Sequence, residues 1–338
     1  MKICTNCILP ETFPGIRFDE QGVCTHCQQF VGRSGKLGED KAKYALKFAQ
    51  LLEQLGRDGR RERRTHDVLM AFSGGKDSTY TLALLKEKYG LRILAVSYDN
   101  GFIAPRAVEN IRNVTERLGV DHVLFKPRWD LLRTIFAAAA EEELYSKKTL
   151  ERASTICTSC IGLVKTACLK MAIEQDIPMI GFGWSPGQAP VQSSIMQTNP
   201  ALLRMTQQAI VGPLKRVAGE DVGAYFLSEK HFAAPEKFPW NVHPLAWEEY
   251  DEGKIFAAIG KLGWQAPRDT DSNSTNCLLN AFANDIHLRR YGFHPYIWEI
   301  ANMVREGVIP RAEGLRKFEE PVPPEWIRAA REKLGLPA

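Results

Sequence analysis

The chain has no long apolar run. No stretch of about 18 apolar residues is present, which is the length that predicts a membrane span. The first residues, Met1 to Cys4, lack the apolar core of a signal peptide. Internal repeats are absent, and low-complexity sequence is limited to Ala137 to Ala140. These absences predict a cytoplasmic protein with no membrane partner and argue against a repeat architecture.

An excess of charge of one sign is also missing. The net charge of +4 over 338 residues is mild, so it neither requires nor excludes a nucleic-acid partner. A hydrophobic content of 44% is ordinary for a soluble globular protein. The length allows two or three domains. Composition therefore limits the class of protein without selecting a substrate.

Histidine spacings typical of a metal site are lacking, but the chain has eight cysteines. In a reducing cytoplasm they are expected to be metal ligands or free thiols rather than disulfides. Two pairs near the N-terminus have the spacings Cys4-x2-Cys7 and Cys24-x2-Cys27, which suit tetrahedral Zn²⁺. The intervening Leu9 to Ile16 segment is rich in Pro and Gly and favours short strands. The pattern predicts a zinc ribbon over residues 1–35, with an iron site or unligated thiols as alternatives.

A Gly-rich turn follows an apolar strand that begins at Val68, and this turn opens a helix. The turn reads Ser73-Gly74-Gly75-Lys76-Asp77-Ser78-Thr79. Glycines let backbone N–H groups approach an anion, and the helix N-terminus attracts it. The spacing departs from the Walker A pattern, which disfavours a kinase or GTPase. The turn therefore predicts phosphate binding, with a full positive charge from Lys76.

This motif resembles that of the PP-loop ATP pyrophosphatases (N-type), whose members hold the pyrophosphate of ATP and cleave between its α and β phosphates. The resemblance implies that Lys76 neutralises the phosphates, that Asp77 helps to hold Mg²⁺, and that both act in catalysis. The residues expected around the phosphates are Ser73, Gly74, Gly75, Lys76, Asp77, Ser78 and Thr79. The alternative is an ordinary strand-to-helix turn.

Three further apolar segments are expected to be strands, at Leu91 to Tyr98, Val120 to Phe125 and Ile177 to Phe182. A helix opened by Pro105 and stopped by Gly119 separates the first two. Apolar strands that alternate with helices predict an α/β fold with a doubly wound parallel sheet, similar to the adenine nucleotide α-hydrolases. Ligands of such sheets bind at the carboxyl ends of the strands.

The remaining nucleotide contacts are expected at the same ends. Backbone groups around Ala71 and Tyr98 would read adenine, and Asp99 or Asn100 would lie near the ribose. Asp-Asn-Gly is also an ordinary turn sequence, which is the alternative. After the fourth strand, a Gly-rich segment that contains Gly181 and Trp184 is expected to be a nucleotide or substrate loop.

A second cysteine group consists of Cys157, Cys160 and Cys277. Cys168 is a poorer third partner, because eight residues of helix span about 12 Å. Three cysteines would hold a [4Fe–4S] cluster and leave one iron open, although composition alone does not separate zinc from iron–sulfur. The alternatives are half of a zinc site or simple packing. The PP-loop enzymes that thiolate tRNA look similar here, with a CxxC before the fourth strand and a later cysteine after a Pro-Leu segment.

Both ends of the chain look similar to the bacterial N-acetyl sugar amidotransferases. The N-terminal similarity covers Cys4 to Thr12 and Phe18 to Cys24, and the C-terminal one covers Gly292 to Pro295 and Val304 to Gly314. We expect four parts: a zinc ribbon at 1–35, a helix and basic linker at 36–65, the ATP-binding α/β domain at 66–215, and a mostly helical region at 216–338 that carries Cys277.

Together these resemblances imply an ATP-dependent transferase. A substrate carbonyl oxygen would be adenylated, with release of pyrophosphate, and then replaced by sulfur through the cluster or by ammonia from a glutaminase partner. The expected acceptor is a small molecule, a nucleotide sugar or tRNA, and the expected partners are a sulfur donor and a second copy in a homodimer. A non-catalytic ATP sensor is the alternative of a different class.

Overall fold

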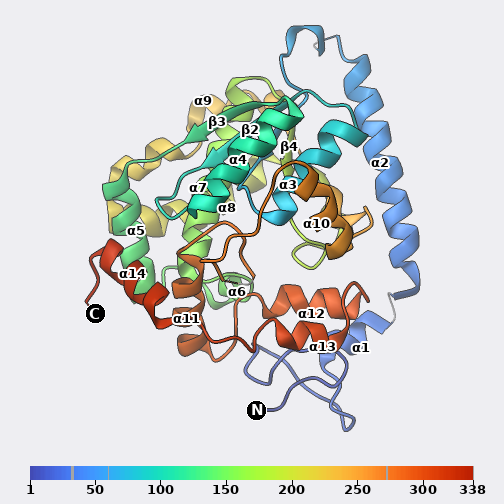
Figure 1. Ribbon diagram of the computed structural model, residues 1–338. Helices are drawn as coiled ribbons and strands as arrows, with labels where there is room; N and C mark the ends of the chain where they lie inside the picture. Colours follow the sequence, from blue (N-terminus) through green and yellow to red (C-terminus); the bar gives the residue numbers. More distant parts are fainter. Residues whose placement is uncertain (32–33, 60, 272, 338) are drawn as a thin grey trace.

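The computed structural model describes residues 1–31, 34–59, 61–271 and 273–337 (Figure 1). Arg60 of the expected linker and Ser272 of the loop before Cys277 lie outside the described residues. The strands are β1 (Val68–Ala71), β2 (Ile93–Tyr98), β3 (Asp121–Phe125), β4 (Met179–Phe182), β5 (Ile195–Gln197) and β6 (Trp240–Val242). The helices are α1 (Thr25–Val31), α2 (Leu37–Arg57), α3 (Lys76–Ala83), α4 (Pro105–Leu118), α5 (Trp129–Glu141), α6 (Lys147–Leu150), α7 (Thr155–Glu174), α8 (Pro200–Ala218), α9 (Glu229–Phe232), α10 (Glu252–Lys261), α11 (Asn280–Tyr291), α12 (Ile297–Arg305), α13 (Arg311–Arg316) and α14 (Pro324–Leu334).

The six strands form one sheet in the order β3-β2-β1-β4-β6-β5. Every neighbouring pair is parallel except β5 with β6. The predicted α/β class with a largely parallel sheet is confirmed. β5 and β6 were not predicted, because three residues are too few to show a period. β6 also lies beyond residue 215, the expected end of the α/β domain.

Both faces of the sheet are covered, as a parallel sheet requires. Val68 and Met70 of β1 pack with the apolar sides of α2, α3, α4 and α10. Leu69, between them in sequence, points to the other face and packs with α7. This alternation buries all three side chains, which explains why β1 reads as an unbroken apolar run.

The ends of β1, β2 and β4 are adjacent because β1 lies between the other two strands. In such a sheet the crossover from β1 runs to one side and the later strands fill the other, which leaves a crevice beyond the strand ends. The phosphate loop after β1, the turn after β2 and the Gly-rich loop after β4 all start at this edge. The topology therefore brings the predicted nucleotide segments together.

The N-terminal segment packs against the far end of the chain, beside α12 and α13 (Figure 1). Thr12 Oγ1 donates to the Gly292 carbonyl at 2.6 Å. The described part of this segment contains single bridges, Ile3 with Pro10 and Phe18 with Cys24, in place of the short strands expected of a ribbon. α1 follows directly and carries Cys27, so one of the four cysteines is helical.

α7 is the one described helix that is long and apolar enough, by length and composition, to cross a membrane. In the fold, α7 packs against β1, β4 and α5, and 44% of its apolar window is buried. Its N-terminal half carries Cys157 and Cys160. The apolar character of α7 thus has a structural explanation in the core of the molecule.

Candidate functional site

A cavity of about 330 Å³ lies at the carboxyl edge of the sheet. Its walls come from the phosphate loop, the end of β2, α7, the loop after β4, the segment before α11, and α12. The residues predicted from sequence that line it are Ala71, Ser73, Gly75, Lys76, Asp77, Ser78, Tyr98, Cys157, Cys160, Trp184 and Cys277. The expected nucleotide and cysteine segments therefore open onto one space.

The phosphate loop is fixed by contacts behind it. Gly74 has φ +75°, and a Cβ there would lie 2.7 Å from the Ala107 carbonyl oxygen, so only glycine fits. Ser78 Oγ and Thr79 Oγ1 donate to the Gly75 carbonyl at 3.0 and 2.8 Å. Gly74 and Thr79 thus hold the turn from behind and do not line the cavity.

One backbone N–H of the loop already has an oxygen partner from a distant segment. Lys76 N donates to Thr275 Oγ1 at 2.9 Å. A Cβ on Gly75 would lie 3.0 Å from the same oxygen. The Thr275 hydroxyl therefore occupies a position in which the loop can receive a phosphate oxygen. Sequence reasoning missed Thr275, because no local pattern signals this long-range contact.

The charge of Lys76 is compensated by a network. Its Nζ donates to Tyr250 Oη and Glu252 Oε1, both at 2.7 Å, and lies 3.3 Å from Asp77. Tyr250 Oη in turn donates to Asp77 Oδ1 at 2.8 Å. Burial works against the charge, but the two carboxylates outweigh it and raise the pKa of Lys76. Lys76 is therefore held as a cation in a fixed position.

The side chains at the end of β2 and just after it point in alternating directions. Tyr98 and Asn100 face the cavity. Asp99 does not line it: its carboxylate accepts from Gly101 N at 2.8 Å and pairs with Lys126 at 3.1 Å. The buried Tyr98 hydroxyl has no hydrogen-bond partner within the described ranges, and burial strongly raises its pKa. Asn100 is thus the polar side chain that the end of β2 offers to a ligand.

Amide groups connect the three cysteines of the cavity. Asn100 Nδ2 donates to both Cys160 Sγ, at 3.6 Å, and Cys277 Sγ, at 3.5 Å. Asn280 Nδ2 donates to Cys157 Sγ at 3.7 Å. Burial raises the pKa of all three thiols, that of Cys157 to about 11. The thiols are therefore neutral unless a cation binds them. Cys168 lies in the core under the sheet.

The loop after β4 reaches the phosphate loop. A Cβ on Gly183 would lie 2.4 Å from Ser78 Cα, so the two segments touch at backbone distance. Trp184 stacks on His243 with ring centroids 4.3 Å apart, and Lys165 Nζ lies 4.2 Å from the Trp184 ring. Desolvation lowers the pKa of Lys165 to about 8. Gly181 lies within β4 against Leu85 and Met70, outside the cavity.

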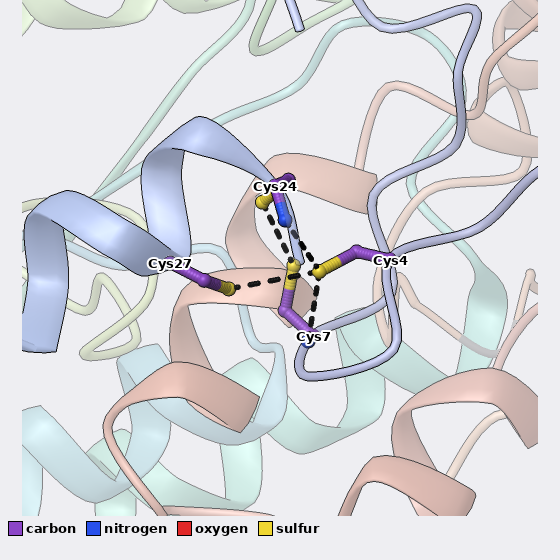
Figure 2. Close-up of side chains that lie close together, drawn as sticks. All are labelled: Cys4, Cys7, Cys24 and Cys27. Atoms are coloured by element: carbon purple, nitrogen blue, oxygen red, sulfur yellow. Dashed lines mark hydrogen bonds between the residues drawn. The ribbon is translucent and has the colours of Figure 1, made fainter. Parts of the chain in front are cut away.

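The four N-terminal cysteines form a separate, compact group (Figure 2). Their Sγ atoms all lie within 4.8 Å of one another, and all four side chains are buried. Cys24 N donates to Cys4 Sγ at 3.2 Å, and Arg305 Nη1 donates to Cys7 Sγ at 3.3 Å. Hydrogen bonds from the thiols of Cys24 and Cys27 lower the pKa of Cys7. The predicted convergence of these cysteines is confirmed.

Arg311 joins this group to the C-terminal helices. Its Nε donates to the Cys7 carbonyl at 2.8 Å and its Nη2 to the Cys4 carbonyl at 2.9 Å. Apolar residues of α12, including Ile300 and Met303, pack against the same cysteines. Arg305 and Arg311 belong to the C-terminal segment singled out in the sequence, which thus has a structural role at the cysteine group.

Comparisons with known proteins give remote similarities. No model of a protein family matches the chain. An uncharacterized protein of Methanocaldococcus jannaschii is 24% identical over 335 residues, which cover 98% of this chain and 99% of that protein. At this identity it does not assign a family.

Similar solved structures include the U34-tRNA thiolase NcsA from Methanococcus maripaludis with its [4Fe-4S] cluster. The match covers 91% of this chain and 88% of the thiolase chain, at 17% identity and a TM-score of 0.37. The NMN synthetase from Francisella tularensis covers 88% and 97% at 11% identity and a TM-score of 0.39. The NAD+ synthetase from Burkholderia pseudomallei covers 95% and 99% at 14% identity and a TM-score of 0.36.

The backbone contact at Gly183 predicts that one added methyl group weakens nucleotide binding. In Gly183→Ala the new Cβ would have to push the loop away from Ser78, because it would lie 2.4 Å from the Ser78 Cα. We expect the affinity for Mg²⁺ and α,β-methylene ATP, measured by calorimetry, to fall at least about tenfold, or about 1.4 kcal/mol. Gly212→Ala, in α8 with nothing within 4 Å of its Cβ, is the control and should bind normally. Equal affinity of both variants would contradict this view of the loop.

The compact sulfur group predicts a metal-dependent stability. Cys24→Ser removes one of four converging sulfurs, so the purified protein should lose zinc and its Tm should fall, because a structural metal contributes folding energy. Cys168→Ala, also buried but outside the group, should retain the metal content of the wild type. Metal analysis and thermal melts measure both effects. Unchanged metal content in Cys24→Ser would refute a metal site here.

The bond from Lys76 to Thr275 predicts competition with a phosphate. Thr275→Val removes the hydroxyl that accepts from Lys76 N. A phosphate would then no longer have to displace it, so the affinity for α,β-methylene ATP should rise about three- to tenfold, as expected for one hydrogen bond of about 1 kcal/mol. Thr275→Ser keeps the hydroxyl and should bind like wild type. Weaker binding by the valine variant alone would mean that Thr275 contacts the phosphate itself.

Proposed function

We propose that the protein is an ATP-dependent transferase. It adenylates a carbonyl oxygen of its substrate, with release of pyrophosphate, and replaces that oxygen with sulfur, so that AMP leaves. One observation carries the proposal: the phosphate loop and the three cysteines Cys157, Cys160 and Cys277 line the same cavity. A protein that only senses ATP has no need of three thiols beside its nucleotide.

The phosphate end of the cavity fits ATP. The loop presents backbone N–H groups, a bare glycine at Gly75 and the start of α3, and one of its N–H groups already binds an oxygen, that of Thr275. Lys76 supplies a fixed positive charge. Asp77 is positioned by Tyr250 and offers a carboxylate to Mg²⁺. These groups bind the phosphates and neutralise charge as pyrophosphate leaves.

The cysteine end of the cavity fits an iron–sulfur cluster better than one zinc ion. In the part of the chain that the structure describes, only the N-terminal cysteines are compact enough for a single ion, so the sulfurs of Cys157, Cys160 and Cys277 are spaced more widely. The thiolates that hold a cluster bind different irons. With three protein ligands, a cluster keeps one iron open to bind sulfide.

The chain's own residues provide the surroundings for such a group. Asn100 and Asn280 donate to the sulfurs and orient them. Trp184 and Lys165 add to the cavity wall, Trp184 from the loop that touches the phosphate loop at Gly183, and an acceptor can lie in the same space. Holding ATP and acceptor together is the main catalytic contribution that this geometry can make.

A second candidate is transfer of nitrogen to an N-acetyl sugar, with ammonia from a glutaminase partner. The two terminal segments that look similar to those amidotransferases favour it. These segments meet in the structure, where Arg305 and Arg311 contact the N-terminal cysteines directly. Both candidates share the adenylation step. They differ in the nucleophile and in the need for a cluster.

Metal analysis of the anaerobically purified protein tests the proposal. We expect about four irons and four acid-labile sulfides per chain, beside about one zinc. Cys277→Ala should lose the iron and the visible absorption of the cluster but keep the zinc, whereas Cys168→Ala should lose neither. Zinc without iron in the wild type would refute sulfur transfer and favour the amidotransferase. Failure of the wild type to release pyrophosphate from ATP with any acceptor would refute both.

A further inference from the structure

The cavity wall carries one carboxyl group that the nucleotide site does not use. Its charged lining residues are Lys76, Asp77, Lys165 and Glu299. Lys76 and Asp77 belong to the network with Tyr250, and Lys165 lies over the ring of Trp184. Glu299 enters the cavity from α12, and no ion pair within the described ranges joins it to a cation. Its role therefore requires a separate explanation.

The Glu299 carboxyl is held in place by the loop after β4. Ser185 Oγ donates to Glu299 Oε1. Asn302 Nδ2, one turn later on α12, donates to the Gly187 carbonyl at 2.9 Å. A Cβ on Gly187 would lie 2.2 Å from the Glu299 carbonyl oxygen, so loop and helix meet at backbone distance. These contacts fix both ends of the residue and direct its carboxyl at the cavity.

The surroundings of Glu299 allow its carboxyl to exchange a proton near neutral pH. Burial raises its pKa to about 7, and the charge of Asp77 contributes in the same direction. Hydrogen bonds from Ser185 and Gln188 and the charge of Lys76 oppose the rise. A group with a pKa close to the working pH is the most effective general acid or base.

Glu299 shares the cavity with both functional ends. The charges of Asp77 and Lys76 in the phosphate loop act on its carboxyl. Tyr296, three residues earlier in the chain, accepts a hydrogen bond at its Oη from Asn280 Nδ2 at 3.2 Å. The same amide donates to Cys157 Sγ. The carboxyl therefore lines the space in which a nucleophile would meet an adenylated substrate.

We propose that Glu299 is the general base that takes the proton of the nucleophile that displaces AMP. This role rests on the proposed function and adds a catalytic residue to it. The nucleophile is hydrosulfide or ammonia, and its sulfur or nitrogen gives an electron pair to the adenylated carbon. The bond from that carbon to oxygen then breaks, and its electron pair leaves with AMP. The proton that the nucleophile carried passes to the Glu299 carboxylate and from there to water.

The test compares two half-reactions in full-length wild type and Glu299→Gln. An acetamido nucleotide sugar and unmodified tRNA are the acceptors, and sodium sulfide and ammonium chloride are the nucleophiles. Single-turnover release of pyrophosphate measures adenylation, and release of AMP with the modified product measures transfer. We expect Glu299→Gln to keep the first rate within about threefold and to slow the second at least about 100-fold, which is the contribution of a general base.

The pH dependence of the transfer rate distinguishes a general base from a structural role of Glu299, because a structural role would leave the pH profile unchanged. Because the base acts in its deprotonated form, transfer by the wild type should be slow below pH 7 and rise through about pH 7. Ser185→Ala removes a hydrogen bond that lowers the pKa of Glu299, so its rise should shift to higher pH. Hydrogen sulfide and ammonium also lose protons as the pH rises, so the rates are compared at equal concentrations of hydrosulfide or of ammonia. The rise that remains after this normalisation should be absent in Glu299→Gln. Glu306→Gln, at the end of α12 and outside the cavity, is the matched control and should keep the wild-type profile.

The outcomes separate this inference from the proposed function. Unchanged transfer in Glu299→Gln, beside normal pyrophosphate release, would overturn the role of Glu299 and leave the transferase intact. Loss of Mg²⁺-dependent binding of α,β-methylene ATP in this variant would overturn it as well, because Glu299 would then serve with Asp77 as a metal ligand. No pyrophosphate release by the wild type would end both proposals.

Discussion

The backbone pairing between the segment before α11 and the residues that follow β2 is the contact on which the arrangement of the site depends. Ala104 N donates to the Asn276 carbonyl and Leu278 N to the Phe102 carbonyl, both at 2.9 Å. The bridge between Ile103 and Cys277 lies between these two bonds, so the pairing holds the third thiol beside β2. The third thiol reaches Cys157 and Cys160 because this segment lies across the strand ends. Without that attachment the cavity would have a nucleotide end only.

The local parts of this architecture were predictable, and the long-range parts were not. The phosphate loop and the α/β sheet follow from apolar period, glycine placement and strand ends, which are all encoded within a few residues. Thr275 and Glu299 line the cavity and Tyr250 positions Asp77, all from segments with no local signature, so only the folded chain reveals them. At the end of β2 the sequence left open whether Asp99 or Asn100 lies near the ribose. The structure turns Asn100 to the cavity and Asp99 to Lys126, because neighbours in an extended chain point opposite ways.

The two cysteine groups differ in the charge of the groups that donate hydrogen bonds to their sulfurs. Four thiolates around one divalent ion leave a net negative charge, and the N-terminal group meets it with the guanidinium of Arg305 and with backbone N–H groups. The cavity group receives neutral donors, among them the amides of Asn100 and Asn280, and its thiols are protonated in the absence of a cation. The first group suits a permanent structural ion, whereas the second suits a cationic group that replaces the protons of its thiols when it binds.

α12 links these two regions, because it packs Ile300 and Met303 on the N-terminal cysteines and presents Glu299 to the cavity. α13 and the loop after β4 also contact this helix, and its packing includes sulfur atoms that lie outside the cavity. Under the proposed metal site, oxidation of those thiols or loss of the metal would loosen the packing of α12 and so move the cavity wall without altering any residue in it. Damage to the N-terminal cysteines would then lower the proposed activity, although none of these cysteines lines the cavity.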